Sequence, residues 1–427
     1  MQRPSLWMMI VVLLLGLLFL REPRLQRSEE YFLRWILKNS QSSGPAAPLT
    51  VVEIGRDPGL RLNAAAADPT EKFLHGPGTS ISALEYALFL QAALEFKPTV
   101  IAFEPILKFR AREKDQEQVF IDQAMRVPKL LLAAELTTTP DPDAPVPEIP
   151  GFTKVTGRRG DIPEFSGIGQ QPDEDLRFIS TLGFINLPAD LADDTDLPAS
   201  KKRAIIHVPL LFQYRGEVIP SFALQAALLW LRVPLTEVKI DIGSFIELPN
   251  GKRIPIRSDG TAFINPSMTR RAHHMSLNEL LLAAQQHDSG AATTARLAQL
   301  KDQILLARTP DNSLGPRDVF AATIASIQTN SFVRRIHRIF ECIVLLLVAG
   351  FSGTARRFSR IDLVLGAFAF SAAYCLLAIT IISHWNLWLP GVLPLGAVWL
   401  LAIFCLFSPR SKNDPDLPSV APPPPSL

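Results

Sequence analysis

Two carboxylates that follow strand-like segments are the residues best placed for chemistry. The segment LTVVEIGRD (49–57) ends in Asp57, and the apolar segment TVIAF (99–103) is followed directly by Glu104. In parallel α/β sheets, ligands bind outside the carboxyl ends of the strands. We therefore expect Asp57 and Glu104 to contact a cation or a polar ligand. Two alternatives stay open: both acids face solvent or cap a helix, or they form the acid–base pair of a hydrolase.

Other kinds of site have little support in the sequence. All three cysteines, Cys342, Cys375 and Cys405, fall in strongly apolar segments, and no CxxC or Cys₂His₂ spacing is present. His273 and His274 are neighbours, so their side chains point apart on a helix or strand. The chain has neither a glycine-rich phosphate loop nor a Gly-x-Ser-x-Gly elbow. We expect no metal, no cofactor and no catalytic residue.

The composition of the 427-residue chain is typical of a membrane protein. Its net charge of +2 provides no positive field for nucleic acid, whereas 48% of its residues are hydrophobic. Residues 5–20 carry no charge and end without a small-x-small cleavage site, so we expect an uncleaved anchor helix. Residues 339–351, 361–383 and 387–407 are three further apolar segments. The sequence therefore predicts four transmembrane helices, one N-terminal and three C-terminal.

Basic residues set the predicted orientation. The positive-inside rule places the loop between the second and third spans, and the tail after the fourth, in the cytoplasm. The basic residues there are Arg356, Arg357, Arg360, Arg410 and Lys412. Residues 25–338 are then on the outer, periplasmic side of a bacterial inner membrane. Arg21, Arg24 and Arg27 follow the first span on that outer side and conflict with the rule. Glu341 lies near the outer end of the second span and is either intramembrane or at the headgroups.

The region between the anchor and the second span alternates between strand and helix patterns. The amphipathic segment 25–38 is followed by strands and helices in turn, which predicts a parallel or mixed sheet with helices on both faces. Residues 137–175 are rich in Pro, Asp, Gly and Thr, so we expect a long loop there. A strand at 204–214, a helix at 220–232 and a β-rich patch follow. A last helix from Asp318 is expected to enter the second span without a break.

The order of these segments resembles a known family. Its pieces are VVEIGRD, ALEYALFLQAALEFKPTVIAFEPIL, LLLAAEL, LGFINLP, HVPLLFQYRGEVIPSFALQAA, SDGTAFINPSM, SLNELLLAA and LKDQILLARTP. Together they look like the second type of extracellular sensory domain of bacterial cyclases and histidine kinases (the CHASE group), over roughly residues 25–408. The chain departs from the family at Pro58, where a second acid is usual, and at Asp318–Ala321, where the family has a Gly-Val-Glu run. The family also continues into a cyclase or kinase domain, for which residues 409–427 are too short.

The resemblance implies a division of the chain and a function. Residues 1–24 would be the anchor, 25–338 the sensory domain, 339–408 a three-helix membrane region and 409–427 a Pro-rich cytoplasmic tail. The protein would be a multi-pass sensor that receives a signal and has no catalytic output of its own. The expected partners are the membrane, an unidentified small-molecule or envelope ligand, a separate cytoplasmic signalling protein and a second copy of the chain. An envelope hydrolase and a structural membrane scaffold are the alternatives.

Overall fold

The structure is a computed structural model that describes residues 23–40, 45–55, 81–109, 114–139, 148–187, 206–289, 300–309 and 318–337, together with 339–340, 342–344, 346–347 and 360–407. The chain divides into two compact units. The sheet unit comprises Leu37–Arg334 and Ile382–Leu387. The helical unit comprises Met1–Ile36, Arg335–Ile381 and Trp388–Leu427.

A seven-stranded sheet forms the centre of the sheet unit, in the order β15-β1-β16-β2-β3-β6, with β7 also paired to β3. The strands are β1 (Leu49–Glu53), β2 (Val100–Phe103), β3 (Leu130–Thr137), β6 (Gly167–Gln170), β7 (Thr181–Phe184), β15 (His273–Ser276) and β16 (Ile304–Arg308). Every pairing is parallel except that of β6 with β3. Strands β2 and β16 are buried at every position, as their uninterrupted apolar sequences require in a covered parallel sheet.

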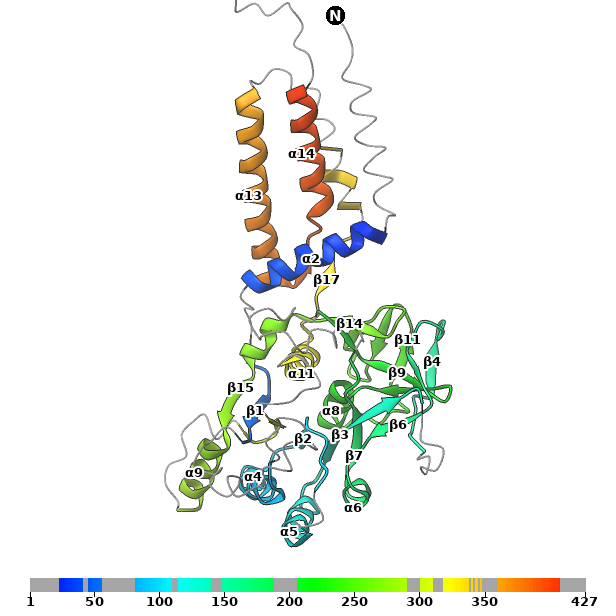
Figure 1. Ribbon diagram of the computed structural model, residues 1–427, viewed down its shortest axis with the longest axis vertical. Helices are drawn as coiled ribbons and strands as arrows, with labels where there is room; N and C mark the ends of the chain where they lie inside the picture. The colour runs from blue at the N-terminus through cyan, green and yellow to red at the C-terminus, as the bar shows by residue number, and fades with distance from the viewer. Residues whose placement is uncertain are drawn as a thin grey trace, which may run out of the picture. The chain divides into compact units, whose positions relative to one another are not determined.

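Helices cover both faces of this sheet (Figure 1). The core on one face includes residues of α4 (Ala83–Glu95), α5 (Lys114–Ala124), α6 (Glu174–Phe178) and α9 (Leu277–Asp288). The core on the other includes residues of α8 (Phe222–Leu231), α11 (Val319–Thr329) and the 3₁₀ helix η3 (Pro266–Arg271). The prediction of a mixed α/β fold with helices on both faces is confirmed.

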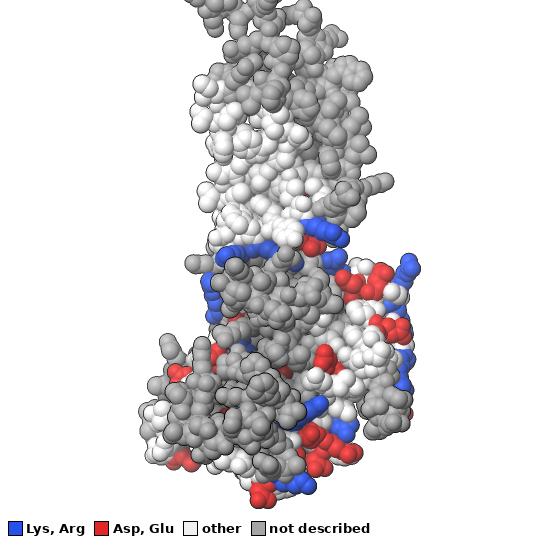
Figure 2. Space-filling view, in the orientation of Figure 1, with Lys and Arg blue, Asp and Glu red and all other residues white. Residues whose placement is uncertain are grey.

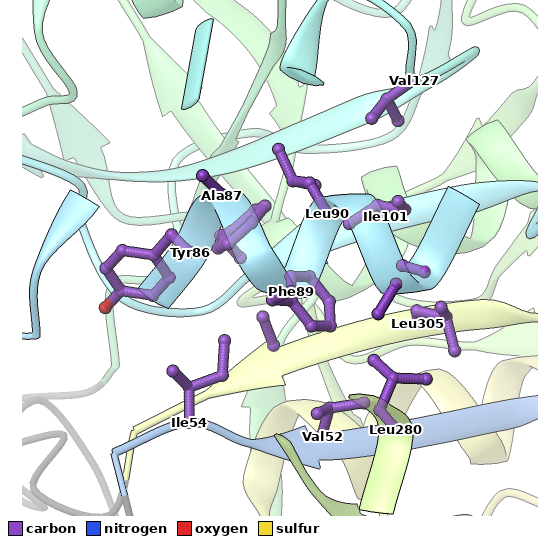
Figure 3. Packing of buried hydrophobic residues seen from close by; sticks show 14 of the residues in the cluster. Val52, Ile54, Tyr86, Ala87, Phe89, Leu90, Ile101, Val127, Leu280 and Leu305 are labelled. Carbon is purple, nitrogen blue, oxygen red and sulfur yellow. The ribbon is translucent and has the colours of Figure 1, made fainter. Parts of the chain in front are cut away.

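The α4 face shows how this core is built. Phe89 and Leu90 of α4 lie near Ile101 and Leu305 of the sheet (Figure 3), and the ring of Tyr86 packs on Phe103. Complete burial of a side chain of this size contributes about 2 kcal/mol to stability. Local signals set where the helices begin: Ser82 Oγ caps α4, and Ser276 and Glu279 form a capping box at α9.

Three small sheets complete the sheet unit. One joins β4 (Lys154–Thr156), β11 (Lys239–Asp241), β12 (Phe245–Glu247) and β13 (Arg253–Pro255). The others join β5 (Glu164–Phe165), β9 (Leu211–Tyr214) and β10 (Glu217–Pro220), and β8 (His207–Pro209) with β14 (Thr261–Phe263). The prediction of a long loop at 137–175 was wrong over its described part, because β4, β5 and β6 all form there. The predicted strand 204–214 is two strands, β8 and β9, in different sheets.

The last helix of the sheet unit also differs from the prediction. Helix α11 ends at Thr329, and its C-cap residue Asn330 adopts a left-handed backbone with φ of 52°. The chain then becomes extended and forms β17 (Arg334–Arg335), which pairs with β18 (Leu387–Trp388). The expected unbroken helix into the second span was therefore wrong. A left-handed residue at this position terminates a helix.

The helical unit contains α2 (Pro23–Asn39, whose last turn enters the sheet unit), α13 (Arg360–Trp385) and α14 (Val392–Phe407). Among the described residues, one helix is long and apolar enough to cross a membrane, Ile361–Trp385. Its 25 residues rise about 37 Å, which exceeds the roughly 30 Å hydrocarbon core. Helix α14 is apolar but shorter. The predicted first span and Glu341 lie outside the described residues, as does part of the second span.

Candidate functional site

The carboxyl edge of the central sheet brings one base and two acids together. Strand β16 lies between β1 and β2, and its last residue, Arg308, is in register with Glu53 at the end of β1. On the other side, Glu104 directly follows β2, and its backbone N–H donates to Ala307 O at 3.0 Å. Three adjacent strand ends thus deliver Glu53, Arg308 and Glu104 to one place.

Arg308 is the centre of this cluster. Only 5% of the residue is exposed, and its Nη2 donates to Glu53 Oε1 at 3.3 Å. Its Nη1 donates to Asp318 Oδ1, which forms a second ion pair. Glu104 is likewise buried and adds its negative charge to the field around the guanidinium. We refer to Glu53, Glu104, Arg308 and Asp318 as the Arg308 cluster.

Asp318 reaches the cluster from an unusual backbone conformation. It occupies the N-cap position of α11 with φ of 81°, a left-handed conformation that is uncommon for residues other than glycine. An aspartate at this position usually accepts a hydrogen bond from the first turn of its helix. The Asp318 side chain makes no such cap and pairs with Arg308 instead. Uncommon backbone conformations of this kind concentrate at binding sites.

The electrostatic balance of the cluster favours a charged arginine. Burial lowers the pKa of Arg308, but the hydrogen bond that Arg308 donates to Asp318 and the charges of Asp318, Glu104 and Glu53 raise it by more, so the net direction of the pKa is upward. Among the residues that the structure describes, one cation then faces three carboxylates. Such a cluster attracts a further positive charge, because the acids outnumber the base.

One donor of the cluster is still available. Arg308 Nε is buried and has no hydrogen-bond partner in the part of the chain that the structure describes. A buried donor without a partner costs roughly 1–3 kcal/mol, so such groups in native proteins commonly have a water or ligand as partner. The Asp318 side chain is 37% exposed, which leaves the cluster open to solvent on that side. The arrangement suits a small molecule that offers both a hydrogen-bond acceptor and a positive charge.

The structure places one of the two predicted site residues and not the other. Glu104 lies at the carboxyl edge of the sheet, as expected, although it is buried. Asp57 lies outside the described residues, so its proximity to Glu104 stays a prediction. Glu53, Arg308 and Asp318 were missed. One sequence signal could have found this site: Arg308 ends the otherwise apolar strand segment ILLAR.

Comparisons of the chain with protein-family models, with curated proteins and with solved structures find no match. Within the described segments, no group of three His, Cys, Asp or Glu side chains has the geometry to hold a metal ion. The chemistry of the cluster must therefore be inferred from its own residues.

Proposed function

We propose that the protein is a multi-pass receptor of the bacterial inner membrane, with a periplasmic α/β domain that binds a small polar ligand at the Arg308 cluster. The observation that supports this most strongly is that the Nε of buried Arg308, within a cluster of three acids, has no hydrogen-bond partner among the described residues. A ligand acceptor would accept a hydrogen bond from the Nε–H group, and a ligand cation would be attracted by the excess of carboxylates. This excess favours a zwitterionic or cationic molecule over a simple anion.

Helix α11 supplies a route for the signal. Its N-cap residue, Asp318, belongs to the cluster, and every residue from Val319 to Gln328 is buried. A ligand that binds the Asp318 carboxylate would weaken its ion pair with Arg308, which holds the N-terminal end of this helix against β16. The chain continues from the other end through Asn330 and β17 into the apolar segment that begins at residue 339. Displacement of a packed element is a common form of switching.

The signal is proposed to pass to another protein, and the chain to have no catalytic output. A separate cyclase, kinase or regulator would then convert the signal. The first test is a pull-down of the full-length protein from native membranes, with mass spectrometry of the co-purified proteins. Glu104→Gln removes a charge of the cluster, and Glu148→Gln removes one from an exposed position.

The outcomes distinguish a receptor from a scaffold. We expect a signalling protein to co-purify, in an amount that changes in Glu104→Gln and stays at the wild-type level in Glu148→Gln. Recovery of envelope or structural proteins only, in equal amounts from all three proteins, would leave the scaffold alternative and reject the receptor. Ligand binding is tested separately by thermal unfolding of the purified protein with each of the twenty free amino acids as a probe.

A further inference from the structure

Helix α2 has two faces of different character. Its inner face carries Glu29, Leu33 and Ile36, which are all at most 1% exposed. Its outer face consists of residues spaced three or four apart, so that they form one stripe along the helix. The members of this outer stripe are Arg27, Tyr31, Arg34, Trp35 and Lys38.

The inner face is attached to the start of α14. The Glu29 carboxylate accepts hydrogen bonds from the backbone N–H groups of Gly391, Val392 and Leu393, at 2.9, 2.9 and 3.3 Å. These groups lie at the N-terminal end of α14, where the first turn of a helix lacks internal acceptors. The ring of Phe32 packs so closely on Gly391 that a Cβ added there would lie 2.0 Å from Phe32 Cε1. Helix α2 is thereby held across the end of α14 (Figure 1).

Helices α13 and α14 form a hairpin within the same unit. Trp399 Nε1 donates to Ser371 Oγ at 3.2 Å, and the Tyr374 hydroxyl donates to Pro390 O. On the face shown in Figure 2, the described surface of this hairpin is mostly uncharged, and basic side chains gather at α2. If α13 crosses the membrane, a helix across the Val392 end of α14 lies at the boundary between the hydrocarbon core and water.

The outer stripe has the composition of a membrane-interface surface. Tyr31 is 56% exposed and Trp35 is 46% exposed, although both are large and largely apolar. Tyrosine and tryptophan collect at the headgroup level of bilayers, because one part of each ring system is apolar and another is polar. The basic residues alternate with them, and long basic side chains reach from the hydrocarbon boundary to phosphate groups. The guanidinium of Arg34 also lies 5.7 Å from the centre of the Tyr31 ring.

We propose that the outer stripe of α2 binds the headgroups of anionic phospholipids. The charge of the outer stripe favours lipid over protein as its binding partner. Three cations along a single stripe complement a layer of phosphates, whereas the core of a protein–protein interface is depleted of charge. The proposal also accounts for an arginine, Arg27, on the side of the membrane where the positive-inside rule expects none. It does not depend on the receptor function proposed above.

The test uses the fluorescence of Trp35 in the full-length protein, reconstituted into bilayers. The signal of Trp35 is the difference between wild type and Trp35→Phe. It is measured in bilayers that contain phosphatidylcholine or phosphatidylglycerol, each brominated near the carbonyl end of its acyl chains, since bromine quenches tryptophan only at close range. Should Trp35→Phe disturb folding, Tyr31→Trp with Trp35 retained adds a reporter one helical turn away on the same stripe, and its signal is the difference between Tyr31→Trp and wild type.

We expect brominated lipid to quench the Trp35 signal, with a preference for phosphatidylglycerol. In the variant Arg27→Gln/Arg34→Gln/Lys38→Gln, the preference for phosphatidylglycerol over phosphatidylcholine should fall by roughly fivefold for each charge removed, at low ionic strength. The control Lys154→Gln/Arg158→Gln/Lys239→Gln removes three exposed charges elsewhere and should retain it. Absence of quenching would show that the stripe does not face lipid. Equal quenching by both lipids, or equal loss in the control variant, would show that it does not select anionic headgroups.

Discussion

Arg308 and Asp318 form an ion pair that joins the end of β16 to the start of α11. The Asp318 side chain makes this contact and forms no cap hydrogen bond with the first turn of α11. The backbone of Asp318 is left-handed. Arg308 is tied on its other side to Glu53 at 3.3 Å, so one buried guanidinium connects two strands and a helix. The consequences of this arrangement, and of the Glu29 contact in the helical unit, can be measured.

The first prediction concerns the charge of Arg308. Replacement by methionine keeps much of the volume but leaves three carboxylates without their cation. Loss of one partner of a buried ion pair costs about 3–5 kcal/mol, so Arg308→Met should lower the free energy of unfolding by that amount. Arg308→Lys should cost less, because the charge remains and only the fork-shaped hydrogen bonding is lost. Chemical unfolding of the full-length protein in detergent measures both.

Arg253 offers a matched control for this substitution. It pairs with Glu247 at 2.9 Å, but its side chain is 61% exposed. Exposed ion pairs contribute about 0–1 kcal/mol, so Arg253→Met should change stability little. If Arg308→Met cost no more than Arg253→Met, the Arg308 cluster would have no structural role.

The second prediction is a pH dependence that originates at Glu29. Burial raises the pKa of Glu29 above its ordinary value of 4.5, although the N–H groups of Gly391, Leu393 and Val392 and the charge of Arg335 act in the opposite direction. Because the folded state holds this proton more tightly than the unfolded state, stability falls as the pH rises from the ordinary value through the raised one. The contribution is fully present below the ordinary value.

Glu29→Gln isolates this effect, since glutamine imitates the protonated acid. The difference in melting temperature between wild type and Glu29→Gln, measured in detergent from about pH 4 to about pH 8, should change in favour of the variant as the pH rises. A difference that stays constant over this range would contradict the assignment to Glu29. Glu148→Gln, at an exposed position, should show no such trend.

The third prediction concerns the packing of α2 on α14. Gly391→Ala forces a methyl group into the ring of Phe32, and overpacking of this kind costs about 1–3 kcal/mol. Gly396 lies within α14, with no atom of the described residues within 4 Å of an added Cβ, so Gly396→Ala should be neutral or stabilising by up to about 1 kcal/mol. Melting of the two variants in detergent makes the comparison.

The pair of residues can also be tested for coupling. If Phe32 is the cause of the clash, then Phe32→Ala should reduce the cost of Gly391→Ala, and the effects of the two substitutions should not add. Strict additivity would instead place the cost of Gly391→Ala in the backbone that precedes α14.

The fourth prediction concerns Gly183, where β7 approaches α8. A Cβ at this position would lie 2.8 Å from Phe222 Cδ2 and 3.0 Å from Phe222 Cα, and the latter is a backbone atom that moves little. Gly183→Ala should therefore lower the free energy of unfolding by about 1–3 kcal/mol. Gly160→Ala is the control, because the nearest atom to its Cβ would be Arg158 Nε at 3.8 Å. Equal stability of the two variants would contradict the close packing of β7 on α8.

Local signals made much of the fold predictable. The apolar residues of 80–95 recur at helical spacing behind a serine cap, and the structure forms α4 there. Residues 361–383 are largely apolar, and α13 includes all of them. Residues 154–170 failed as a prediction because their strands are two to four residues long and carry many polar side chains. Such strands are stabilised by their partners β11, β9 and β3, which the local sequence does not reveal.

The sequence by itself determined that Glu104 ends a buried strand and that the chain contains a helix long enough to cross a membrane. Only the tertiary structure decided that β16, from the end of the sheet unit's sequence, inserts between β1 and β2. That insertion brings Arg308 to Glu53 and sets it in the field of Glu104. The physical reason is that an apolar pattern predicts which residues are buried but not which strand lies beside them. The neighbour of each strand depends on how helices far apart in the sequence pack on the two faces of the sheet.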